Sequence, residues 1–195
     1  MYCQSLCLML VVTVCSAPLT LEAQQPFVHG SDVAFTVWTD QTRYSIGKPI
    51  VVHYAVKNIS NGALFVPSSQ WDVRCGAPPH FWARLEDTSG KHYEPGYGGS
   101  CLGPNPLDRM SIAERMRKDA VLLKPGQSVR GSFTFDPEVF RDLNAGTYRL
   151  EAVLYGWNLA FSESELTELS AMGAPFLTGE RHSTTHIDLQ AASKN

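Results

Sequence analysis

The strongest constraint on the fold is a set of short apolar runs, most of them alternating, that are separated by glycine, proline and asparagine. In residues 33–38, for example, Val33, Phe35 and Val37 fall on one face of an extended chain. Such alternation predicts half-buried strands, because successive side chains of a strand point to opposite sides. The runs of this kind are 33–38, 50–57, 63–66, 81–85, 129–135, 147–155 and 186–189.

Turn residues lie between these runs, and helix signals are few. Segments 46–49, 58–62 and 124–127 are rich in Gly, Pro, Asn and Ser, which suit tight turns. Short helices are predicted only after the capping sequences that begin at Ser111, Asp136 and Ser162. The pattern predicts an all-β, two-sheet antiparallel sandwich of about seven strands with short helical insertions.

Composition limits the class of protein. The chain has 195 residues, of which 44% are hydrophobic, so it can build one domain with a sizeable core. Its 16 basic and 19 acidic residues are interspersed and give a net charge of −3. A nucleic-acid binder would show a basic patch, so we expect no nucleic-acid partner.

The N-terminus predicts export. The apolar run 5–15 is too short to span a bilayer, which needs about 20 residues, but it fits the core of a signal peptide that is cleaved after Ala23. The alternative is a buried N-terminal strand. We therefore expect a secreted or periplasmic protein with no membrane span once the signal is removed. The expected organisation is signal peptide 1–23, linker 24–31, sandwich domain 32–190 and C-terminal tail 191–195.

Cysteine usage agrees with export. Cys3, Cys7 and Cys15 would leave with the signal peptide, and Cys75 and Cys101 would remain. A single pair in an exported chain predicts a disulfide, and two free thiols are the alternative.

Several turn and strand motifs resemble those of a known fold family. They are the segments 44–50 (YSIGKPI), 56–60 (VKNIS), 123–127 (LKPGQ) and 145–150 (AGTYRL). With them the chain resembles the immunoglobulin-like domains of exported bacterial proteins and is similar to the intracellular proteinase-inhibitor (BsuPI) type. The resemblance implies an immunoglobulin-like sandwich over most of the chain, with Tyr148 in the core and its hydroxyl bonded at a strand corner. The signal peptide and the cysteine-containing loop depart from the inhibitor type.

No sequence motif points to catalysis. The chain has no G-x-S-x-G, H-E-x-x-H, Walker or dinucleotide-binding sequence, so we expect no enzyme and no cofactor. His182, His186 and Asp188 would share one face of a strand, and such groups can bind zinc. Neighbouring positions on that face lie about 7 Å apart, too far for a tight tetrahedral site. We expect no metal there, only the polar, solvent-facing side of an edge strand.

The candidate ligand-binding residues lie in the segment 71–101. Rigid aromatic rings on a tethered loop suit the recognition of a glycan or a protein, although the same rings can simply pack in the core. The candidates are Trp71, His80, Trp82, Tyr93 and Tyr97.

Two further features have a functional and a structural interpretation. The basic residues Arg109, Arg115, Arg117 and Lys118 could attract an acidic partner, but a solvated helix face is the interpretation we favour. Asn58-Ile59-Ser60 is an N-glycosylation sequence, and a role for Asn58 in the turn explains it without a sugar.

The expected function is therefore an exported, non-catalytic binding or structural module whose partner is an unknown protein or glycan. One alternative is a proteinase inhibitor that acts through an exposed loop. Another is a glycan-binding module that uses the aromatic loop 71–101, and an enzyme assembled from distant residues is the third.

Overall fold

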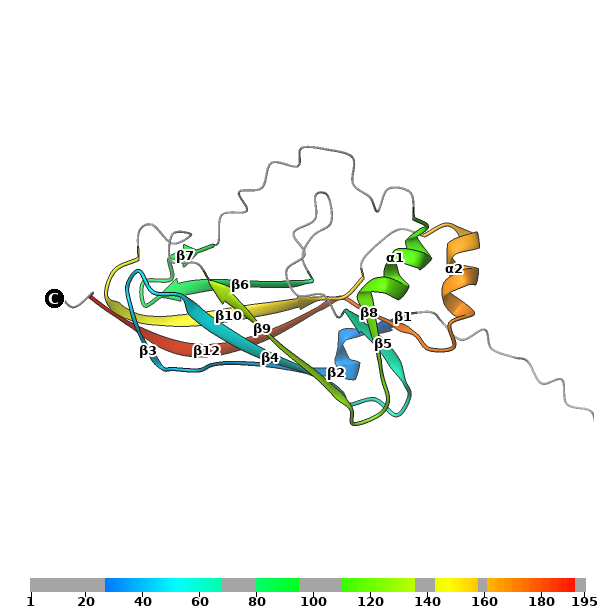
Figure 1. Cartoon of the computed structure of the whole chain (residues 1–195), viewed down its shortest axis with the longest axis horizontal. Helices are drawn as coiled ribbons and strands as arrows, with labels where there is room; N and C mark the ends of the chain where they lie inside the picture. Colours follow the sequence, from blue (N-terminus) through cyan, green and yellow to red (C-terminus); the bar gives the residue numbers. More distant parts are fainter. Residues whose placement is uncertain (1–26, 68–79, 95–109, 136–142, 158–160, 192–195) are drawn as a thin grey trace, which may run out of the picture.

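Two β-sheets packed face to face form the body of the molecule (Figure 1). The computed structural model describes residues 27–67, 80–94, 110–135, 143–157 and 161–191. One sheet is antiparallel, in the order β2-β4-β9. Its strands are β2 (Val33–Thr39), β4 (Ile50–Asn58) and β9 (Ser128–Phe135).

The second sheet has the order β3-β12-β10-β6-β7. All its pairs are antiparallel except β3 with β12. The order β2-β4-β9 corresponds to strands A, B and E of an immunoglobulin domain, and β12-β10-β6 corresponds to G, F and C. The prediction of an immunoglobulin-like sandwich is therefore confirmed. The strands are β3 (Arg43–Ser45), β6 (Phe81–Asp87), β7 (His92–Tyr93), β10 (Gly146–Tyr155) and β12 (Glu180–Gln190).

The apolar faces predicted from the alternation form the core between the two sheets. Phe81 of β6 lies over Tyr54 of β4, with ring centroids 4.2 Å apart. Tyr148 is buried at the start of β10, where its hydroxyl donates a 2.9 Å hydrogen bond to the Asn144 carbonyl. This is the corner contact that the resemblance implied, and it ties the turn before β10 to the core.

A smaller unit, here called the end cap, covers one end of the sandwich (Figure 1). It consists of a mixed sheet, β1-β11-β5-β8, and two helices that pack against each other. Met116, Trp157, Leu169 and Phe176 form its own small core. Its elements are β1 (Phe27–His29), the 3-10 turn Gly30–Asp32, β5 (Leu64–Pro67), α1 (Ile112–Asp119), β8 (Ala120–Leu123), α2 (Glu163–Ser170) and β11 (Phe176–Thr178).

Each of the predicted runs is a strand, and the last one is longer than predicted because β12 begins at Glu180. α1 and α2 begin after the predicted caps Ser111 and Ser162, whereas the helix predicted at Asp136 lies outside the described residues. β1 forms within the expected linker 24–31. No helix in the described ranges has the length and apolar character needed to cross a membrane.

Candidate functional site

The outer faces of the two sheets differ in how their charges are arranged. We call the outward side of β6, β7, β10 and β12 the paired face, and the outward side of β2, β4 and β9 the Trp38 face. The Trp38 face consists of Ala34, Thr36, Trp38, Val51, His53, Ala55, Lys57, Ser128, Arg130, Ser132 and Thr134.

On the paired face, the carboxylate of Glu151 joins three strands. Glu151 is only 8% exposed and accepts two hydrogen bonds. Arg84 on β6 donates to its Oε2 at 2.7 Å, and His182 Nδ1 on β12 lies 3.0 Å from its Oε1. Burial raises the pKa of Glu151, but the bonds from His182 and Arg84 outweigh that effect and hold the pKa below its ordinary value.

A second group of charged residues on the paired face also forms ion pairs within the sheet. Glu86 is bonded by Arg149, and it lies 3.6 Å from His92 Nδ1. Nε2 of His182 lies 3.3 Å from Glu180 Oε2. The arginines of this face are therefore already paired with carboxylates.

His182, His186 and Asp188 lie on the outer side of β12, but β12 is not a free edge strand at its end, because β3 pairs with Asp188–Gln190. Asp188 accepts a 2.7 Å hydrogen bond from the hydroxyl of Thr147 and lies 4.0 Å from Arg43. His182 bonds to Glu151 and Glu180, as described above, and His186 is exposed. Within the described ranges, no group of three or more potential ligands is placed to hold a metal ion.

The Trp38 face presents an exposed aromatic ring that is held in place. Trp38 on β2 is 40% exposed and stacks on His53, its direct cross-strand partner on β4. The ring centroids lie 5.6 Å apart and the planes differ by 19°. The neighbouring outward positions hold the small side chains of Thr36 and Ala55.

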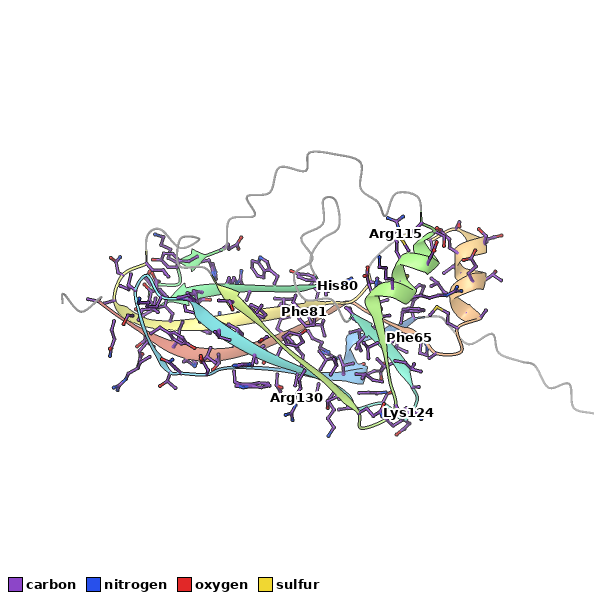
Figure 2. All side chains as sticks on the ribbon, in the orientation of Figure 1. Phe65, His80, Phe81, Arg115, Lys124 and Arg130 are labelled. Carbon is purple, nitrogen blue, oxygen red and sulfur yellow. The ribbon has the colours of Figure 1, made fainter. Side chains whose placement is uncertain are left out.

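Two basic residues, Arg130 and Lys57, also lie on the Trp38 face, at a distance from Trp38. Arg130 on β9 lies opposite Ala55, and Lys57 follows two residues later on β4 (Figure 2 labels Arg130). Both are exposed, and neither forms an ion pair with a carboxylate in the described part of the chain. All outward positions of these three strands are described, and none of them is acidic.

The described loop candidates do not meet on one surface. Nδ1 of His80 lies 2.9 Å from the Tyr155 carbonyl oxygen, and its ring contacts Trp157 where β6 adjoins the end cap (Figure 2). Burial lowers the pKa of the His80 imidazole, which favours the neutral form of the ring. Trp82 lies on the paired face, with the guanidinium of Arg84 5.5 Å from its ring centroid.

Of the remaining aromatic candidates, the structure describes Tyr93, which lies beside neither His80 nor Trp82. Tyr93 packs edge-on against Tyr148 and donates a 3.0 Å hydrogen bond to Asp87, at the far end of β6 from His80. Trp71 and Tyr97 lie outside the described residues, as do Cys75 and Cys101. The binding role of the loop and the disulfide therefore stay predictions.

The fold accounts for part of the basic cluster. α1 carries Arg115 and packs against the acidic helix α2. Hydrogen bonds from Ser162, together with the charge of Arg115, lower the pKa of Glu165 on α2. Arg117 and Lys118 are exposed, as on a solvated helix face, and Arg109 lies outside the described residues.

Asn58 has a structural role in the turn after β4. Its side chain is fully buried, and Nδ2 donates to the carbonyls of Gly62 at 2.7 Å and of Leu123 at 2.9 Å. Its Oδ1 accepts from the backbone N–H and the hydroxyl of Ser60. The amide nitrogen that would carry a sugar is therefore used inside the protein.

Trp38 belongs to no recognised motif, but the sequence contains a signal for its exposure. Val33, Phe35 and Val37 point inward, so the alternation places Trp38 outward. An exposed tryptophan on the outer face of a strand is a candidate contact residue, because a rigid aromatic ring offers a large contact area.

Comparisons with known proteins leave the family open. No family model matches the chain, and no curated protein matches it. Similar solved structures include a β-glucosidase from Erythrobacter marinus (13% identity, TM-score 0.40), which covers 81% of this chain and 15% of that one. A β-glucosidase from Listeria innocua in complex with laminaribiose gives 12% identity, a TM-score of 0.36 and coverages of 81% and 16%.

The CARDB domain of a Pyrococcus furiosus protein, in complex with di-metal ions, is also similar. It gives 13% identity, a TM-score of 0.34 and coverages of 82% of this chain and 88% of that one. This chain thus spans about 15% of the length of the β-glucosidases it resembles. The fold assignment depends on the strand pairing, and similarity to the proteinase-inhibitor type is not shown.

Proposed function

We propose that this chain is an exported, non-catalytic immunoglobulin-like module that binds its ligand through the Trp38 face. The observation that carries the proposal is the exposed indole of Trp38, held in one orientation by its stacking on His53. An immobilised aromatic ring offers a large contact area and loses little conformational entropy when a ligand binds.

Contacts elsewhere in the sandwich also favour the Trp38 face as the binding surface. The backbone N–H of Val37, next to Trp38, donates a 3.1 Å hydrogen bond to Ser183 on β12, which ties the edge of this sheet to the opposite sheet. Trp38 therefore stands on a rigid element, which favours precise recognition. The arginines of the paired face, in contrast, are engaged in ion pairs within the fold.

Retention on immobilised polymers tests the proposal. Purified mature protein is passed over neutral polysaccharides, acidic polysaccharides and envelope proteins, alongside Trp38→Ala and the matched control Trp82→Ala. We expect the wild type and the control to bind at least one polymer, and Trp38→Ala to bind it at least about tenfold more weakly, the equivalent of 1.4 kcal/mol. Circular dichroism and urea unfolding verify that both variants fold.

The alternatives give different results in the same design. If the wild type inhibits a protease and Trp38→Ala inhibits it equally well, a loop inhibitor replaces the present proposal. If Trp82→Ala loses glycan binding and Trp38→Ala does not, the binding surface lies on the other side of the sandwich.

The export part of the proposal has its own test. Mass spectrometry of the chain from the exported fraction should find Gln24 at the N-terminus, which follows from cleavage after Ala23. A full-length chain that is retained in the cytosol would contradict it.

A further inference from the structure

We infer that the ligand of the Trp38 face is an acidic polysaccharide whose sugar rings carry carboxylate groups. This inference rests on the proposed function and adds the chemical class of the ligand. It depends on the charges of the face, on the polar groups around Trp38 and on the spacing between the ring and the cations.

The charges of the Trp38 face favour an anionic ligand. The whole chain carries a net charge of −3, yet the outward positions of β2, β4 and β9 hold two cations and no carboxylate. Lys57 and Arg130 form no ion pair among the described residues, whereas Arg84 and Arg149 on the opposite face do. An exposed guanidinium without a partner is available for a bidentate contact with a ligand carboxylate.

The surroundings of Trp38 select a sugar among anionic ligands. The apolar face of a sugar ring stacks on an indole, while its hydroxyl groups need donors and acceptors at the rim. Thr36 and Ser132 supply hydroxyls beside the Trp38–His53 stack, and the His53 ring supplies nitrogens. Two cations on one sheet are too few for the continuous basic stripe that a nucleic acid needs.

The spacing indicates a polymer. Arg130 lies two strands across from Trp38 and one two-residue step along the sheet. Strand geometry makes this separation about 12 Å between Cα atoms, and about 14 Å from Trp38 to Lys57. Since these distances exceed a single sugar ring, we infer that Trp38 and the cations contact different units of one chain. Short oligomers should therefore bind better than monomers.

The test uses two probes with the same sugar backbone, polygalacturonate and its fully methyl-esterified form, in which neutral methyl esters replace the carboxylates. Isothermal titration calorimetry compares the wild type, Arg130→Ala, Lys57→Ala and Trp38→Ala. The control is Arg117→Ala, which removes an exposed cation from α1. We expect Arg130→Ala and Lys57→Ala each to weaken polygalacturonate binding about tenfold, because each removes a charge-assisted contact. Arg117→Ala should bind like the wild type.

The methyl ester separates charge from stacking. We expect it to bind more weakly than polygalacturonate, and Arg130→Ala and Lys57→Ala to bind it as the wild type does. Added salt should weaken only the binding of the acidic form. Trp38→Ala should reduce the binding of both probes.

The outcomes distinguish the inference from the function on which it rests. If the ester binds as tightly as polygalacturonate and both depend on Trp38, the inference of an acidic ligand is wrong and the binding module stands. If Trp38→Ala changes binding to no polymer, both are wrong. If vesicles of phosphatidylglycerol or a sulfated glycan compete as well as polygalacturonate, the face recognises polyanions in general and the carboxylate assignment is overturned.

Discussion

The ring of Tyr54 occupies the space that a side chain at Gly131 would need. The two residues are direct cross-strand partners on β4 and β9, and a Cβ on Gly131 would lie 2.8 Å from Tyr54 Cε1 and closer still to the hydroxyl. Tyr54 in turn stacks on Phe81 of the opposite sheet, so the ring cannot move aside freely. A glycine at this position is therefore a condition for the packing between the sheets.

Gly131→Ala should accordingly destabilise the fold. Overpacking of this kind lowers the free energy of unfolding by about 1–3 kcal/mol, which urea denaturation measures. Gly62→Ala is the matched control, because no atom lies within 4 Å of a Cβ at that position. Equal stability of the two variants would show that Tyr54 can shift without loss.

Tyr148→Phe removes only the hydroxyl of the strand corner. The bond to the Asn144 carbonyl is lost while the ring stays in the core, so the free energy of unfolding should fall by about 1 kcal/mol. Tyr155→Phe serves as the control, since its hydroxyl makes no hydrogen bond within the described part of the chain. A loss of the same size in both variants would argue against a specific corner contact.

Asn58→Ala tests whether the amide joins the turn after β4 to the end of β8. The substitution leaves the buried Leu123 carbonyl without its donor and frees the Ser60 turn, which should lower the free energy of unfolding by about 3 kcal/mol. Asn61 is an exposed neighbour in the same turn, and the control substitution Asn61→Ala should leave the free energy of unfolding almost unchanged. Stability like that of the wild type in Asn58→Ala would reopen the glycosylation interpretation.

Stability at low pH should depend on Glu151. Its pKa is lower in the folded protein than its ordinary value of 4.5, so ionised Glu151 stabilises the fold above pH 4.5, and this contribution is lost as the pH falls through the lowered pKa. Glu151→Gln should be less stable by about 1–3 kcal/mol at pH 7. Its free energy of unfolding should also fall less steeply below pH 4.5 than that of the wild type.

The control for Glu151 is Glu180→Gln, whose carboxylate is more than half exposed and, among the described residues, pairs with Nε2 of His182. We expect it to follow the wild-type curve when unfolding is measured by circular dichroism between pH 7 and pH 3. A Glu151→Gln curve parallel to that of the wild type would mean that another carboxylate governs acid unfolding.

The predicted disulfide is tested by peptide mapping under non-reducing conditions. We expect one peptide pair joined through Cys75 and Cys101 in protein from an oxidising compartment. Cys75→Ser with Cys101→Ser should be less stable by about 3–4 kcal/mol, because the unfolded chain gains loop entropy. Free thiols in the exported protein would contradict the prediction.

The sequence was sufficient for the sandwich, because local alternation decides which residues a strand buries. Phe81 and Tyr148 could be placed in the core from their own neighbours in the chain. The end cap could be predicted only in part: β5, α1 and α2 have local signals, whereas β1, β8 and β11 were not predicted. β8 (Ala120–Leu123) has four successive apolar or small residues and no alternation, and β1 pairs with a strand almost 150 positions away.

The candidate sites could likewise be predicted only where they depend on local sequence. The outward position of Trp38 follows from alternation within one strand, whereas its stacking on His53 requires the register between β2 and β4. The bonds of Glu151 to Arg84 and His182 depend on the registers of three strands that are distant in sequence. Registers of this kind are set by the packing of the whole sheet, so no local pattern reveals them.

The opposite placement of β1 and the end of β12 along the long axis has a mechanical consequence (Figure 1). A stretching force applied between residues 27 and 191 would run nearly parallel to the strands. β12 is bonded along its length to β10 and, at its end, to β3, so such a force would shear many hydrogen bonds at once instead of opening them one after another. At the other end the force would act on β1, which pairs with β11 at three described positions, so we expect β1 to separate before β12 does.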